Sequence, residues 1–139
     1  MNIDITHHSF HSVRDRWNSI LPHCSINTLF ITPIWNQLWW DATTHQEEPL
    51  LIEFHQNEQT IGIAPLMRQQ DSIALMGDPD LFDYQDFIVL EDAEQTFFTS
   101  LLDFLDDEPW NELTFPSLRE DSKTLSFIPE LANKKGWHC

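Results

Sequence analysis

The sequence predicts one domain over residues 1–139 with an α/β (α+β) fold, in which helices flank a mixed, largely antiparallel sheet. Three observations support this fold class. Apolar residues recur at helical spacing near both ends of the chain, short β-rich runs lie between residues 50 and 90, and strands and helices then alternate. Residues 1–27 are assigned to an amino-terminal extension of this domain.

The first predicted helix covers residues 10–20. Its apolar residues are three, four and three positions apart, which places them on one helical face: Phe10, Val13, Trp17 and Ile20. Ser9 can cap the start of this helix, and Pro22 ends it. We therefore expect an amphipathic helix with one buried face.

A second helix is predicted over residues 33–42. Thr32 is a favourable N-cap residue, and Pro33 suits the first helical position. The inner face of this helix is expected to carry three residues: Trp35, Leu38 and Trp39. Trp40 lies off that face, where it would cover a neighbouring segment or line a cleft.

Four short strands are predicted next, over residues 50–55, 60–67, 72–76 and 86–90. The polar turn between the first two makes them a hairpin. Pro65 has no N–H to donate, so the far half of the second strand is expected at a sheet edge or a bulge. Gly77 ends the third strand, and a turn-rich loop leads to the fourth.

The remaining chain is predicted to form a helix over 92–106, a strand over 110–115 and a helix over 121–135. Asp92 would cap the first of these helices, and Pro129 would divide the second into two pieces. The residues after Gly136 look like the start of another strand. A sheet without that strand has an exposed edge, so we expect the chain to be the front part of a longer protein.

The charge balance limits the partners. Seven Lys and Arg oppose 23 Asp and Glu, which gives a formal net charge of −16. So acidic a surface repels polyanions, and we expect no nucleic acid and no membrane as partners. Cys24 and Cys139 form neither a disulfide framework nor a metal clip, which favours a cytoplasmic protein with free thiols.

Seven histidines raise the question of a metal site. His7, His8 and His11 lie close together, and His7 and His11 would share one helical face if the first helix began earlier. No HExxH motif or Cys/His clip accompanies them. The interpretation favoured is a solvated histidine-rich stretch without metal. The alternative is a small metal-binding protein built on these three residues.

The loop over residues 77–87 is the strongest candidate for chemistry. It holds four carboxylates, one tyrosine and two phenylalanines between two predicted strands. Neighbouring carboxylates raise one another's pKa, so one of them can serve as a general base near neutral pH. The alternative is an acidic turn whose aspartates cap backbone N–H groups, with Phe82 and Phe87 in the core. The tryptophans of the second helix could likewise stack on a planar ligand or pack inside.

Six segments between residues 28 and 139 carry a family resemblance. They are Phe30–Trp35 (FITPIW), Leu38–Trp40 (LWW), Ile61–Arg68 (IGIAPLMR), Gly77–Phe87, Trp110–Leu113 (WNEL) and Lys134–Trp137 (KKGW). Together and in this order, they resemble the acetyltransferases related to cellulose biosynthesis protein D, which are FemAB-like members of the GNAT superfamily.

This resemblance implies a GNAT-like fold, incomplete at its carboxy-terminal edge, and transfer of an acyl group from acyl-CoA to an amine or hydroxyl acceptor by the full-length protein. A C-terminal GNAT-like unit of the same longer protein would be the partner. This chain lacks the Q/R-x-x-G-x-G/A loop whose N–H groups bind the CoA diphosphate at a helix start. We therefore expect no cofactor in this chain, acetyl-CoA as co-substrate of the full-length protein, and no activity from the chain alone.

The resemblance also implies roles at the site. Asp83 and Asp86 match the family's loop, and one of them would orient or deprotonate the acceptor, with Tyr84 as a positioning donor. Trp39 and Trp40 would line the acceptor cleft or pack beside it. The alternative function, favoured by the missing phosphate loop, is a non-catalytic interaction or binding module with a decayed GNAT-like fold.

Overall fold

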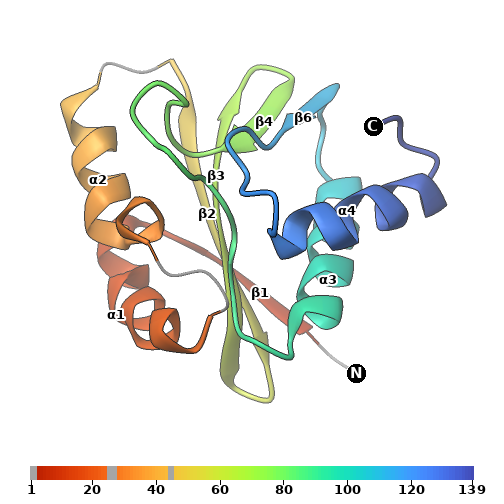
Figure 1. Ribbon diagram of the computed structural model, residues 1–139, viewed down its shortest axis with the longest axis horizontal. Coiled ribbons are helices and arrows are strands. Elements are labelled where there is room, and N and C mark those ends of the chain that lie inside the picture. The colour runs from red at the N-terminus through yellow and green to blue at the C-terminus, as the bar shows by residue number, and fades with distance from the viewer. Residues whose placement is uncertain (1–2, 25–27, 44–45) are drawn as a thin grey trace.

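The computed structural model describes residues 3–24, 28–43 and 46–139. Its elements in chain order are β1 (Ile3–His8), α1 (Phe10–Ile20), η1 (Leu21–His23), η2 (Leu29–Ile31), α2 (Pro33–Ala42), β2 (Glu48–Gln56), β3 (Gln59–Gln69), β4 (Ser72–Leu75), β5 (Ile88–Val89), α3 (Glu94–Asp106), β6 (Glu112–Thr114) and α4 (Lys123–Lys134). The strands form one sheet with helices on both faces (Figure 1).

β3 is the central strand of this sheet, whose order is β1-β2-β3-β4-β6. One edge of β3 pairs antiparallel with β2 over residues 59–68. The other edge pairs antiparallel with β5 at residues 62–63 and with β4 at residues 66–69. β6 adds to β4 as a parallel strand. The chain between β4 and β5 therefore leaves the sheet and returns to the same edge of β3.

Each face of the sheet has its own pair of helices, α1 and α2 on one side and α3 and α4 on the other (Figure 1). On the α1 side, Trp17 is fully buried, and its indole Nε1 donates to the carbonyl oxygen of Ile31 at 2.8 Å. On the α3 side, Phe54 packs edge to face on Phe97, with ring centroids 5.0 Å apart. Burial of large side chains on both faces stabilises the arrangement.

The predicted fold class is confirmed by this mixed, largely antiparallel sheet flanked by helices. Two predicted helix caps are also confirmed. The Ser9 side chain accepts from the backbone N–H of Ser12 at the start of α1, and the Thr32 side chain accepts from that of Trp35 at the start of α2. The predicted hairpin forms from β2 and β3.

The prediction that Pro65 marks an edge or bulge is wrong. Pro65 lies in the central strand opposite Leu51, and β3 continues beyond it to Gln69. The Pro65 carbonyl oxygen accepts from the backbone N–H of Met76 at 2.8 Å. The N–H and C=O of one strand residue point to the same side, so the missing donor faces the place where the chain leaves the sheet after β4.

The predicted inner face of α2 is also wrong in part. Leu38 is 60% exposed, and the polar residue Asn36 is buried in its place. The Asn36 side-chain amide donates to two backbone carbonyl oxygens just before and at the start of the helix, which satisfies it inside the fold. Trp35, Trp39 and Trp40 are half-buried. Tertiary packing thus buries a different face of α2 from the one that the spacing of its apolar residues predicts.

Several element boundaries differ from the prediction. β1 has no predicted counterpart, because its apolar alternation is limited to Ile3 and Ile5, which is too short a pattern to predict a strand. α3 begins at Glu94 rather than Asp92, α4 is one continuous helix through Pro129, and the residues after Gly136 form no strand. None of the helices within the described ranges has the length and apolarity to cross a membrane.

Gly62 in β3 occupies a position where the core has no room for a larger residue. A Cβ there would lie 2.3 Å from one ring carbon of Phe97 and 3.0 Å from the carbonyl oxygen of Ile88. We expect Gly62→Ala to lower the free energy of unfolding by about 1–3 kcal/mol, measured by urea denaturation. The cost should shrink in a Phe97→Leu background, where the clash partner is smaller, and an equal cost in both backgrounds contradicts this packing.

Candidate functional site

The 77–87 loop is held against the sheet where β4 ends. Gly77 has a φ of +128°, and a Cβ there would meet the Gln85 side-chain nitrogen at 2.8 Å. Both facts require glycine at this turn. Gln85 is buried, and its Nε2 donates to the carbonyl oxygen of Met76 at 3.0 Å. The loop is therefore anchored to the end of β4 through a buried side chain.

An aromatic cluster joins this loop to α2. Phe82, buried at its centre, packs on Phe30, Trp35 and Trp39, with ring centroids 6.3, 5.9 and 5.8 Å away. Trp40 extends the cluster through Trp39, at 6.1 Å. The structure thus brings together Trp39 and Trp40, the two tryptophans predicted for the acceptor side, and places them in the wall behind the loop.

Tyr84 stands at the rim of this cluster. Its side chain is 38% exposed, and its ring contacts Phe30 from the cluster at 6.5 Å between centroids. The guanidinium carbon of Arg119 lies 5.2 Å from the Tyr84 ring centroid, a cation–π contact. The Gln85 backbone N–H donates to the carbonyl oxygen of Ser117 at 3.1 Å. The loop is therefore flanked by α2 on one side and by the β6–α4 connection on the other.

Asp83 and Asp86, the two predicted catalytic residues, lie in different environments. Asp83 is exposed at the surface of the loop. Asp86 is buried, and its carboxylate accepts from the hydroxyls of Ser122 and Thr124, each at 2.5 Å. Ser122 also caps α4, so Asp86 connects the loop to the start of that helix.

The environment of Asp86 favours its protonated form. Burial raises the pKa of the Asp86 carboxyl above its usual range, and hydrogen bonds from Ser122, Thr124 and the Phe87 N–H lower it in part. A raised pKa is suited to proton transfer, but hydroxyl donors surround this carboxylate inside the fold. Its role as a general base stays a prediction.

Sequence reasoning missed Arg119, Ser122 and Thr124. Ser122 could have been found, because a serine before a helical run is an N-cap signal. Its contact with Asp86 joins residues 36 positions apart, however, and local sequence patterns do not predict such a contact. The same holds for Arg119, whose contact with Tyr84 depends on the path of the β6–α4 connection.

The N-terminus of α3, which follows β5, is a candidate anion site. Free N–H groups at such an end attract anions. Here the flanking side chains are acidic, namely Glu91, Asp92 and Glu94, and the N-cap residue Ala93 offers no side-chain hydrogen bond. These carboxylates oppose a diphosphate at this helix start.

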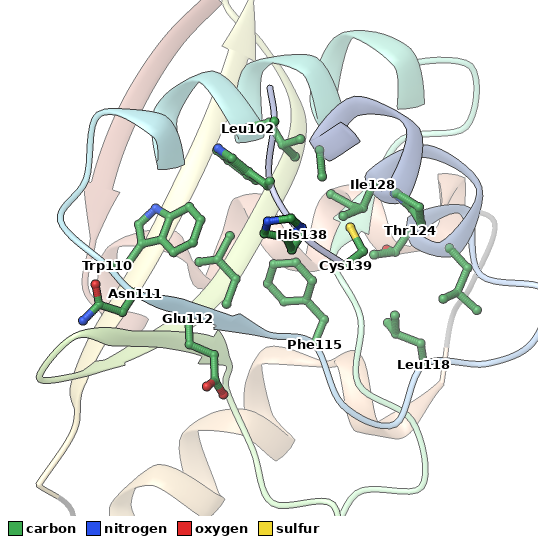
Figure 2. A pocket seen from close by; sticks show the side chains of 16 residues that line it. Leu102, Trp110, Asn111, Glu112, Phe115, Leu118, Thr124, Ile128, His138 and Cys139 are labelled. Carbon is green, nitrogen blue, oxygen red and sulfur yellow. The ribbon is translucent and has the colours of Figure 1, made fainter. Parts of the chain in front are cut away.

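A pocket of about 500 Å³ lies on the α3–α4 face, between β6, α4 and the last four residues. Figure 2 shows Trp110 and Ile128 on opposite sides of it, with Phe115 and His138 between them. Its walls are mostly apolar, and the indole of Trp110 packs on that of Trp137 at 4.9 Å between centroids. Sequence analysis did not identify this pocket, because its walls come from segments far apart in the chain.

The structure does not bring His7, His8 and His11 together. His7 lies against the Phe104 ring on the α3 side, with centroids 5.8 Å apart. His8 is the next residue of the same strand, so its side chain points to the opposite face, where it contacts Ser12 and Glu53. The histidine trio considered as a metal site is therefore divided between two faces of the sheet.

Both cysteines are free, as the sequence suggests. Burial raises the pKa of the Cys24 thiol to about 11, although a hydrogen bond from the Val89 backbone lowers it. The thiolate is the nucleophilic form of cysteine. Cys24 is therefore unsuited to act as a nucleophile at neutral pH.

The raised pKa of Asp86 predicts a pH dependence. The pKa of Asp86 in the folded protein exceeds its value of about 3.9 in the unfolded chain. Between these two values the folded protein holds a proton that the unfolded chain releases. The stability that this group contributes is therefore lost as pH rises through the folded pKa. Asn mimics the protonated carboxyl. The unfolding free energy of the native protein relative to Asp86→Asn should therefore fall as pH rises from about 4 to 7.

Urea denaturation at several pH values measures this difference. In Ser122→Ala, the loss of stability should move to higher pH, because the variant removes a hydrogen bond that lowers the pKa of Asp86. A difference that stays constant or grows with pH contradicts the raised pKa.

Comparison with known proteins identifies the fold. No protein-family model and no curated protein sequence matches the chain. Among solved structures, it is similar to an aminoglycoside antibiotic 6'-N-acetyltransferase from Acinetobacter baumannii, with a TM-score of 0.57 and 12% sequence identity. The match covers 99% of this chain and 92% of that one. The chain therefore has a GNAT-like α/β fold.

Proposed function

We propose that this chain supplies the acceptor-binding side of a GNAT-type acyltransferase, which moves an acyl group from acyl-CoA to an amine or hydroxyl acceptor. The observation that carries this proposal is the GNAT-like fold, which extends over 99% of the chain. A fold alone does not define a reaction. Further support comes from the polar rim that the 77–87 loop and the β6–α4 connection form beside the aromatic cluster.

We assign Asp83 and Tyr84 to the acceptor. Both are exposed at the rim, so an acceptor can reach them without displacing core residues. An amine that attacks a thioester carbonyl must lose a proton, which the Asp83 carboxylate can accept. The C–S bond breaks as the C–N bond forms, and the CoA thiolate that leaves takes up that proton from Asp83. The Tyr84 hydroxyl can hold the acceptor in place. The net charge of −16 favours a cationic or neutral polar acceptor.

We assign Asp86, Trp39 and Trp40 to positioning. Asp86 connects the loop to the start of α4 through two hydroxyls. Trp39 supports the loop through Phe82, and Trp40 packs on Trp39. In this assignment they set the place of Asp83 and Tyr84. Acyl-CoA binding is proposed for a C-terminal GNAT-like unit of a longer protein, since acidic side chains surround the start of α3.

Calorimetric titration with acetyl-CoA tests this division. The chain alone is expected to give no binding, whereas a longer native product that contains the second unit is expected to bind and to acetylate amines. Binding by the chain alone contradicts the assignment of acyl-CoA to a second unit. Absence of binding and of transfer in both contradicts the acyltransferase proposal and favours a non-catalytic binding module.

Asp83 can be tested in the protein that carries out the transfer. Asp83→Asn is expected to lower kcat/KM for an amine acceptor by about 100-fold or more, because the base is lost. Asp80→Asn, which alters an exposed carboxylate of the same loop, is the matched control and should retain the native rate. Steady-state assays with varied acceptor distinguish the two, and normal turnover in both Asp83→Asn and Asp86→Asn contradicts a carboxylate base in this loop.

A further inference from the structure

Glu53 is a carboxylate in the middle of β2 with no solvent exposure. It lies on the α1 face of the sheet, two residues after Leu51, which belongs to the core on that side. A buried carboxylate is costly unless charged or hydrogen-bonding partners compensate it. Its surroundings are therefore expected to contain specific partners, and they do.

Two histidines converge on one oxygen of Glu53. His8 Nε2, from the end of β1, lies 2.6 Å from Oε1, and His55 Nε2, from β2, lies 3.0 Å from the same atom. The three ligand atoms all lie within 4.8 Å of one another. The His8 side chain is only 7% exposed, and that of His55 is 18% exposed. The group is thus largely buried, and His55 is its most exposed member.

The second oxygen of Glu53 is held separately. Thr60 Oγ1 donates to Oε2, and Arg16 Nε from α1 lies 3.5 Å from it. These contacts leave Oε1 directed at the two imidazoles. Groups that hold the ligands of a metal ion from behind fix their orientation and raise affinity.

The other hydrogen bonds of His8 bear on whether a cation lies between its Nε2 and Oε1 of Glu53. Ser12 Oγ is 2.8 Å from His8 Nδ1 and is placed to donate its single proton to the carbonyl oxygen of Ser9 at 3.2 Å. In the tautomer that carries its proton on Nδ1, His8 donates to Ser12 Oγ, which also accepts from the Ser9 backbone N–H at 3.0 Å. This assignment leaves Nε2 with a lone pair facing a carboxylate oxygen, a repulsive pair unless a cation, either a proton or a metal ion, lies between them.

We propose that His8, Glu53 and His55 bind a divalent transition-metal ion of the zinc class. Two imidazoles and a carboxylate are a donor set that zinc accepts, with an open fourth position for water. Tetrahedral zinc holds its ligand atoms roughly 3.4 Å apart. The observed separations of 2.6 and 3.0 Å need only small side-chain rotations to reach that value. Metal binding needs the unprotonated ligand atoms, so any proton on them passes to solvent.

Such an ion would connect β1 to β2 immediately before α1 begins. β1 is the edge strand of the sheet and pairs only with β2 among the described residues. Because the folded chain gathers the three ligands and the unfolded chain does not, metal binding stabilises the folded state. The site is separate from the 77–87 loop, so its test does not depend on the proposed acyl transfer.

The test uses the untagged full chain, first stripped with a chelator and then titrated with ZnCl2 by calorimetry. We expect one zinc ion per chain, a higher Tm with zinc, and visible absorption of four-coordinate cobalt when Co2+ replaces it. His55→Gln should weaken zinc binding by more than about 100-fold, and Ser12→Ala by about 10-fold, because it removes the partner of His8 Nδ1.

His7→Gln/His11→Gln is the matched control, since it removes two neighbouring exposed histidines that do not face Glu53. Its zinc affinity should equal that of the native chain. Native-like circular dichroism of His55→Gln shows that loss of binding is not loss of folding. If that variant unfolds, imidazole NMR shifts of the native chain on adding zinc decide the matter. Absence of zinc binding, binding that survives in folded His55→Gln, or binding lost in the control variant overturns the proposal.

Discussion

The pairing of β3 on both edges is the constraint on which the rest of the structure depends. β2 covers one edge continuously, whereas the other edge is shared between two short strands, β4 and β5. Because both strands belong to one stretch of chain, the residues between them must leave the sheet and return to it. That excursion is the 77–87 loop, and its anchoring through Gln85 and Phe82 places the exposed Asp83 and Tyr84 beside α2.

Two buried carboxylates, one on each side of the sheet, are compensated in different ways. Glu53 faces cationic or metal-binding partners, namely two imidazoles and a guanidinium. Asp86 is surrounded by hydroxyl and N–H donors, and burial raises the pKa of its carboxyl. The first environment offers a donor set for a cation, whereas burial in the second favours the protonated carboxyl. The two sites can therefore serve different purposes in one small domain.

The GNAT-like fold and the acidic start of α3 have to be considered together. The fold is shared with an N-acetyltransferase over nearly the whole chain, yet Glu91, Asp92 and Glu94 border the helix start that follows β5. A fold provides a framework on which sites can be gained or lost. The charges at this helix start oppose the binding of a diphosphate there, although the fold is that of an acetyltransferase.

The sequence by itself determined the fold class, the caps Ser9 and Thr32 and the β2–β3 hairpin, because caps, turns and periodicity act between residues close in the chain. The residue types of the 77–87 loop made it a candidate site, and the resemblance then implied roles for Asp83 and Asp86. Only the tertiary structure decided that Asn36 rather than Leu38 faces inward and that Asp86 meets Ser122. It also brought His8 to Glu53, 45 residues away. Such contacts depend on how the sheet and the helices pack, and the spacing of residues along the chain does not determine that packing.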